Sequence, residues 1–263
     1  MKVFECADGE IKEQESLMKA LKIDINKKQV ISFVGGGGKT SLIYELGEEL
    51  SKLGKKVIVT TTTHMFMPTD NVVLTGKKED IVKLLDCENL ITVGIKAIEK
   101  GISSNETNKS SEEKLEKISG LPVNIAKDLI ELADFVLVEA DGSKRLPLKA
   151  PAEHEPVILE GSNLVIGICG IDAIGKEIGE TCHRPSLVAN LLKVDIKHVV
   201  NESDIAKILL SDRGSKKDVK CDYKAVINKV DNEELLKKAV KISSESYKLG
   251  LTELVLTTFR EKI

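Results

Sequence analysis

The chain has 263 residues, of which 41% are hydrophobic and 31% charged, a composition typical of a soluble globular protein. Its 39 basic and 42 acidic residues give a net charge of −3, which argues against a nucleic-acid surface built on bulk charge. No apolar stretch is long enough for a membrane span, no signal-peptide core is present, and the five cysteines lack CxxC spacing, so we expect a cytoplasmic protein without a zinc site or disulfide framework.

The first predicted elements are a helix over residues 11–21, a buried strand over 30–34 and an amphipathic helix that begins at Thr40 and ends before Gly54. The turn into the second helix reads Gly35, Gly36, Gly37, Gly38, Lys39, Thr40 and Ser41. Such a turn presents backbone N–H groups and the positive end of the helix dipole to an anion. We predict a phosphate-binding loop in which Lys39 reaches the β- and γ-phosphates of a nucleotide and the Thr40 hydroxyl ligates Mg²⁺.

A second strand, predicted over residues 56–60, would complete a parallel βαβ unit with the first. Its end continues into Thr62, Thr63 and His64, at the carboxyl edge where ligands bind in parallel sheets. Threonine also favours strands on its own account. Ligand contact and strand propensity therefore both remain open as explanations of this polar run.

The pattern between residues 71 and 132 is weaker. It predicts strands over 71–74 and 90–95, a helix over 79–85, a polar loop over 103–111 and a helix over 122–132 that begins at a proline.

Two acidic residues, Glu139 and Asp141, follow a buried strand predicted over residues 135–138. P-loop proteins hold Mg²⁺ through a carboxylate at the tip of such a strand. A buried carboxylate is costly without a cation or donors nearby, which favours a metal or water role over a structural one. We therefore expect Lys39, Glu139 and Asp141 to be the catalytic group, without distinguishing which carboxylate faces the metal.

The segment 142–156 carries three prolines, which exclude a regular helix or a central strand. Because it follows the predicted metal site, we interpret it as a switch or substrate loop with Lys144, Arg145 and His154 as candidate contacts.

A second candidate loop follows the buried strand predicted over residues 164–169 and ends at a helix over 186–192. It contains His183 and Arg184, and Arg184 is suited either to gripping an anionic ligand or to a surface salt bridge. Cys182 next to His183 favours a structural or substrate-facing role over metal ligation.

The last motif, Asn228-Lys229-Val230-Asp231, follows a strand predicted over residues 223–227. In this NKxD pattern the aspartate accepts hydrogen bonds from N1–H and the 2-amino group of guanine, which adenine lacks. The motif predicts a preference for GTP. A helix over 233–249 and a strand over 253–257 close the predicted fold.

These motifs together resemble several groups of metallocentre-assembly nucleotidases. The loop lacks the first glycine of GxxxxGK[ST], since Phe33 stands there, and is similar to the GGxGKT form of nitrogenase iron protein relatives. The ExxG pattern of Glu139 resembles that of the nickel and cobalamin GTPase chaperones. The set from VISFVGGGGKTS through TTTTHM, LVEADGSKRLPLKAPAEHEPVI and CHRP to INKVD most resembles the YqeC family, described as accessory factors for selenium-dependent molybdenum hydroxylases.

The resemblance implies a single P-loop α/β domain over residues 1–263, with a mostly parallel sheet, helices on both faces and inserted loops near 100–120 and 142–160. It implies GTP or ATP, Mg²⁺ and a molybdenum hydroxylase or its cofactor as partners, and leaves a homodimer open. Three functions follow: an NTP-hydrolysing assembly factor, which we favour; a small-molecule kinase or nucleotidyl transferase that uses ATP; and a nucleotide-gated binding protein with negligible turnover.

Overall fold

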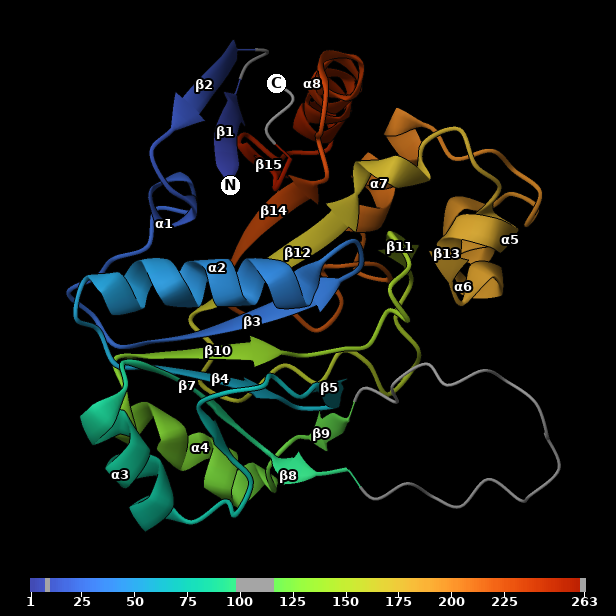
Figure 1. Ribbon diagram of the computed structural model, residues 1–263. Helices are drawn as coiled ribbons and strands as arrows, with labels where there is room; N and C mark the ends of the chain where they lie inside the picture. Colours follow the sequence, from blue (N-terminus) through green and yellow to red (C-terminus); the bar gives the residue numbers. More distant parts are fainter. Residues whose placement is uncertain (8–9, 98–115, 261–263) are drawn as a thin grey trace, which may run out of the picture.

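The computed structural model describes residues 1–7, 10–97 and 116–260, and its centre is a ten-stranded sheet (Figure 1). Eight neighbouring strands are parallel, and β1 and β2 add an antiparallel hairpin at one edge. In sheet order the strands are β2 (Glu10–Gln14), β1 (Lys2–Ala7), β15 (Leu254–Thr258), β14 (Asp222–Asn228), β12 (Leu164–Gly170), β3 (Gln29–Gly35), β10 (Phe135–Glu139), β4 (Val57–Thr61), β7 (Leu90–Val93) and β6 (Val72–Val73).

Helices cover both faces of this sheet because its central strands are apolar on both sides. On β10, Phe135 and Leu137 pack in the cluster that contains α2, whereas Val136 and Val138 pack with α3 and α4. One face carries α1 (Leu17–Ala20) and α2 (Lys39–Lys52), and the other carries α3 (Lys78–Cys87), α4 (Val123–Leu132), α7 (Glu202–Leu210) and α8 (Glu233–Lys248). Figure 1 shows α2 running lengthwise beside β3.

Smaller elements lie beyond the carboxyl ends of the parallel strands. A three-stranded sheet is formed by β5 (His64–Phe66), β9 (Lys117–Ser119) and β8 (Ile95–Lys96), and a two-stranded one by β11 (Leu148–Lys149) and β13 (Cys182–His183). The 3₁₀ turn η1 (Ile171–Ala173), α5 (Ile178–Thr181) and α6 (Pro185–Leu192) complete the described elements. In the described part of the chain, no helix is long and apolar enough to cross a membrane.

Most predicted elements are confirmed, but the prediction for the N-terminal region is wrong. The helix predicted over residues 11–21 is β2 followed by the single turn of α1, which Ser16 caps through the N–H of Lys19. Strand β1 was not predicted, because it forms by pairing with β15 at the far end of the chain. The polar loop predicted over 103–111 lies outside the described residues.

The predicted βαβ unit is present with one strand more than expected. β3 and β4 are parallel, but β10 lies between them and pairs with both. The chain leaves β3 in one direction toward β4 and later returns to its other side at β12. At such a reversal, beside the carboxyl ends of the strands, parallel α/β sheets commonly bind ligands.

Candidate functional site

The glycine run at the end of β3 forms a tight turn into α2 that requires glycine. Gly35, Gly37 and Gly38 have positive φ angles of 98°, 81° and 116°. A Cβ atom on Gly37 would lie 2.2 Å from the backbone nitrogen of Gly170, so the close approach of two backbones also demands glycine there. Gly38 is the N-cap residue of α2, and it provides no side-chain capping hydrogen bond to the first turn of the helix. The positive end of this 14-residue helix is therefore available to an anion.

Lys39 begins α2 and is buried against the loop that it follows. Its ammonium group donates to the carbonyl oxygen of Gly35 at 2.6 Å and lies 3.1 Å from Oδ1 of Asp141. Asp141 also accepts the N–H of Gly35, at 3.2 and 3.1 Å to its two oxygens. The predicted loop lysine and one of the predicted carboxylates are therefore in direct contact, with 2% of each side chain exposed.

The other predicted carboxylate, Glu139, lies beside the threonine of the loop. The Thr40 hydroxyl donates to Oε2 of Glu139 at 2.7 Å. Burial raises the pKa of Glu139 above its usual value, against the opposing effect of the Lys39 ammonium and the Thr40 hydrogen bond. A hydroxyl and a carboxylate at this distance are oxygen ligands of the kind Mg²⁺ takes beside nucleotide phosphates, so the residues fit the ion. No described group of three or more His, Cys, Asp or Glu residues could form a metal site by itself.

Part of the segment 142–156 lies directly on the glycine loop. The carbonyl oxygen of Leu146 accepts the N–H of Gly37 at 3.0 Å, and that of Pro147 accepts the N–H of Gly170 at 2.9 Å. Three N–H groups of the loop therefore bond to the protein itself in this conformation, that of Gly35 to Asp141, that of Gly36 to the carbonyl oxygen of Ile168 and that of Gly37 to Leu146. The predicted switch or substrate loop contacts the predicted phosphate loop through its backbone.

The residues of the NKVD motif lie at the end of β14, next to the same loop. Asn228 is buried and contacts Gly37, whereas Lys229 forms an ion pair of 2.8 Å with Asp172. Asp231 accepts a 2.6 Å hydrogen bond from the hydroxyl of Thr258 on β15. These contacts tie the motif to the glycine loop, to the turn η1 and to the end of β15.

An open cavity of about 450 Å³ adjoins this motif. Its lining consists of Asp172, Lys229, Asp231, Asn232, Leu235, Phe259 and Arg260. Oδ1 of Asp172 is buried and has no hydrogen-bond partner among the described residues.

Four candidate ligand contacts, three in segment 142–156 and one in the threonine run, lie at the surface. Lys144, Arg145, His154 and His64 are exposed, and the Arg145 guanidinium stacks 4.5 Å from the ring centre of Phe66. Lys144 and Arg145 have positive φ angles of 49° and 63°, an uncommon conformation for residues other than glycine.

The threonines of the run make hydrogen bonds to other groups of the protein. Thr61 and Thr62 donate to the carbonyl oxygens of Glu139 and Val157 at 2.8 and 2.6 Å, and the N–H of Thr63 donates to Thr61. These contacts join β4 to the segment that follows β10. Ser41 of the glycine loop has an exposed side chain.

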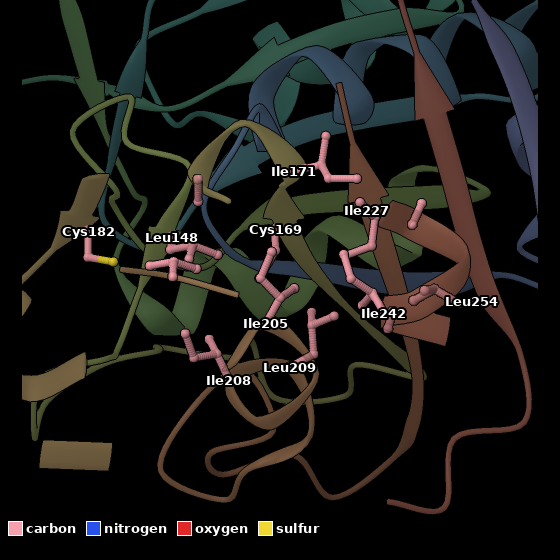
Figure 2. Close-up of a cluster of buried hydrophobic side chains, with 14 of the residues drawn as sticks. Leu148, Cys169, Ile171, Cys182, Ile205, Ile208, Leu209, Ile227, Ile242 and Leu254 are labelled. Carbon is pink, nitrogen blue, oxygen red and sulfur yellow. The ribbon is translucent and has the colours of Figure 1, made fainter. Parts of the chain in front are cut away.

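Arg184 forms a salt bridge, the second of its two predicted alternatives, although a partly buried one. Its guanidinium donates to both carboxylate oxygens of Glu155, at 2.5 and 2.9 Å. Burial, with the charges of Arg184 and Lys149, lowers the pKa of the neighbouring His183, which favours the neutral ring. Cys182 packs in an apolar cluster with Leu148 (Figure 2), and burial raises its pKa to about 12. A protonated thiol there is structural.

The sequence analysis missed two buried charged residues and two threonines. The ammonium group of Lys149 lies 3.0 Å from Asp141 and 2.6 Å from Glu155. Lys149 and Glu155 both stand in the proline-rich segment 142–156. Thr257 and Thr258 hold Asn228 and Asp231 from the end of β15. A charged pair inside a segment with three prolines is the one signal that could have drawn attention to Lys149 and Glu155.

Comparison with known proteins agrees with the resemblance of the sequence. Residues 31–186 match the family model described as YqeC protein. A protein of Escherichia coli (strain K12) described as "Uncharacterized protein YqeC" is 33% identical over 210 residues, which cover 76% of each chain. The matched region of the family model includes the glycine loop, both carboxylates and Arg184.

Proposed function

Since this chain belongs to the YqeC family, we propose that it is a Mg²⁺-dependent P-loop nucleotidase that prefers GTP and assists the maturation of selenium-dependent molybdenum hydroxylases. The observation that carries the nucleotide part is the 2.7 Å contact of Thr40 with Glu139 at the uncapped start of α2. A hydroxyl, a carboxylate and a buried lysine meet there at the end of a glycine turn. These groups suit a nucleoside triphosphate with its metal ion.

The roles of the residues follow from their charges and positions. Lys39 would release the Gly35 carbonyl and bind the β- and γ-phosphates, while the N–H groups at the start of α2 bind their oxygens. Thr40 and Glu139 would hold Mg²⁺, which neutralises charge on the phosphates when bound. The Leu146 carbonyl would leave the N–H of Gly37, so the phosphates and segment 142–156 compete for the same donor.

Support for guanine comes from the surroundings of Asp231. Thr258 holds Oδ1 of this carboxylate at 2.6 Å, which orients the group at the edge of the cavity. A fixed carboxylate accepts hydrogen bonds from the N1–H and 2-amino groups of guanine, and adenine offers neither. Asn228 keeps the motif beside the phosphate loop through its bond to Gly37.

The maturation role rests on the family resemblance, together with the loops beyond the carboxyl edge. Segment 142–156 contacts the glycine loop, and the Arg184–Glu155 pair joins this segment to the region from β13 to α6. These loops would handle the cofactor or the client enzyme in the cytoplasm while nucleotide is bound.

The test is a phosphate-release assay on the purified protein with MgGTP and MgATP, in the presence and absence of a purified selenium-dependent hydroxylase. We expect release to be faster with GTP and to be abolished in Lys39→Met. Tight binding without release would point instead to a nucleotide-gated binding protein. Phosphate transfer to a small molecule, with no free phosphate, would indicate a kinase.

A further inference from the structure

A row of buried groups with alternating charge begins at the phosphate loop and runs away from it. Lys39 pairs with Asp141 at 3.1 Å, Asp141 with Lys149 at 3.0 Å, and Lys149 with Glu155 at 2.6 Å. Arg184 ends the row through its two hydrogen bonds to Glu155. The side chains of Asp141 and Lys149 are 2% and 1% exposed, so water screens neither charge.

Asp141 is thus balanced by two ammonium groups. One belongs to Lys39, whose other contact is the Gly35 carbonyl at 2.6 Å, and the other to Lys149. A lysine that binds phosphate must leave the carboxylate it is paired with. A buried carboxylate that loses its only cation is strongly destabilised, so a second cation on Asp141 lowers the cost of releasing Lys39.

Lys149 is held in place independently of Lys39. It donates to the carbonyl oxygen of Gly142 at 2.7 Å, and its backbone belongs to β11, in which Lys149 pairs with His183. Glu155, the other partner of Lys149, is also paired with Arg184, and this pair does not involve Lys39. Movement of Lys39 toward a nucleotide would therefore leave the rest of the row intact.

We propose that Lys149 is a positioning residue for nucleotide binding: its charge keeps Asp141 neutralised and so releases Lys39 to the phosphates. This inference rests on the proposed function. Without Lys149, Asp141 would hold Lys39 as its sole ammonium partner, and the nucleotide would have to compete with that ion pair. Lys149 itself would not touch the nucleotide.

The experiment is a mutant cycle in which MgGTP affinity is measured by calorimetry for the full chain. Lys149→Met should weaken binding roughly tenfold or more, about 1.4 kcal/mol. Adding Asp141→Asn should restore most of the loss, because the competing carboxylate is then uncharged. Lys149→Arg, which keeps the charge, should bind more tightly than Lys149→Met. Unchanged affinity in Lys149→Met, or a folded double variant that is not restored, overturns the inference.

A second comparison serves if Lys149→Met does not fold. Asp141→Asn alone and the double variant should then bind MgGTP equally, since residue 141 carries no charge for Lys149 to balance in either. A difference of more than about threefold, roughly 0.7 kcal/mol, overturns the inference. Failure of the unaltered protein to bind either MgGTP or MgATP would instead overturn the proposed function, so the two failures are distinguishable.

Discussion

The side-chain amide of Asn228 donates a 2.8 Å hydrogen bond to the carbonyl oxygen of Gly37, across a separation of 191 residues. Its amide oxygen accepts the hydroxyl of Thr257 at 2.9 Å. The ends of β3, β14 and β15 are therefore tied together by one side chain. In a nucleotide complex this tie would fix the distance between the phosphate site and the cavity beside Asp231, so the two halves of the site would recognise one ligand.

Base preference depends on Asp231. Asp231→Asn replaces an acceptor by a donor on the atom that would face N1 and the 2-amino group of guanine. We expect GTP affinity to fall roughly tenfold or more, since hydrogen bonds to charged groups contribute about 1.5–3 kcal/mol, and xanthosine triphosphate to become the better ligand. Competition binding measures both. Preference of the unaltered protein for ATP would contradict guanine recognition.

Nucleotide binding should depend on Lys39. Lys39→Met removes the ammonium but keeps most of the side-chain volume, so we expect MgGTP binding to be lost by calorimetry. The free energy of unfolding should fall by about 1–3 kcal/mol, because Asp141 loses one of its two cations in a buried site. Lys52→Met, at an exposed position on the same helix, is the control and should change neither quantity. Wild-type affinity in Lys39→Met would exclude the phosphate loop.

Glu139→Gln should change stability and metal dependence in opposite directions. Burial raises the pKa of Glu139, so its ionised form is a cost to the folded state that develops as pH rises above the ordinary value of 4.5. The glutamine removes that cost but still accepts the Thr40 hydroxyl. We expect a higher free energy of unfolding at pH 7 and a Mg²⁺-dependent affinity weakened by about tenfold or more, 1.4 kcal/mol. Asp141→Asn should affect Mg²⁺ dependence less. Unchanged Mg²⁺ dependence would mean a structural carboxylate.

Acid stability should depend on Glu155. Against the effect of burial, hydrogen bonds from Arg184 and Lys149 lower its pKa to about 2. Its stabilising contribution is complete above the usual value of 4.5 and is lost as pH falls toward 2. Glu155→Gln should therefore be less stable at pH 7 and lose less stability between pH 5 and 3 in urea unfolding. Glu153→Gln, at an exposed neighbouring position, is the control. Parallel pH profiles would contradict the assignment.

The cellular role predicts a specific defect. A strain that carries Lys39→Met should make the client hydroxylase in normal amount but leave it inactive, with low selenium content. Molybdenum enzymes that need no selenium should be unaffected, since the common cofactor pathway lies upstream. Selenium and molybdenum analysis of the purified client decides the matter. Full selenium loading and full activity would remove this role and leave the nucleotide chemistry unexplained.

Local patterns predicted the central part of the fold well. The apolar runs that became β10 and β12 have no polar interruption, and the run that became β3 has only Ser32, because both faces of each strand are covered by helices or loops. The same reasoning failed for β1 and β2, since β1 pairs with β15 at the other end of the chain and β2 is added to the sheet through β1. Local propensity carries no information about a partner about 250 residues away.

The candidate site was predicted in part for a similar reason. The contact of Thr40 with Glu139 follows from two motifs that each end a parallel strand or begin the next helix, so the sheet brings them together. Lys149 could not be found this way. It lies on a two-residue strand inside a proline-rich segment, where no periodicity marks a buried side chain. Its burial depends on ion pairs that only the assembled fold provides.

The two edges of the ten-stranded sheet also bear on self-association. At one edge, β6 has only two residues, and at the other, β2 exposes Glu10, Lys12 and Glu13. If two copies joined antiparallel along β2, centring the pair on Lys12 would set two lysines opposite each other. Shifting it by one residue in one direction would oppose Glu10 to Glu13, and in the other direction Lys12 to Glu13. Like charges directly opposite destabilise strand pairs, so two of these three registers disfavour a homodimer that extends the sheet along β2.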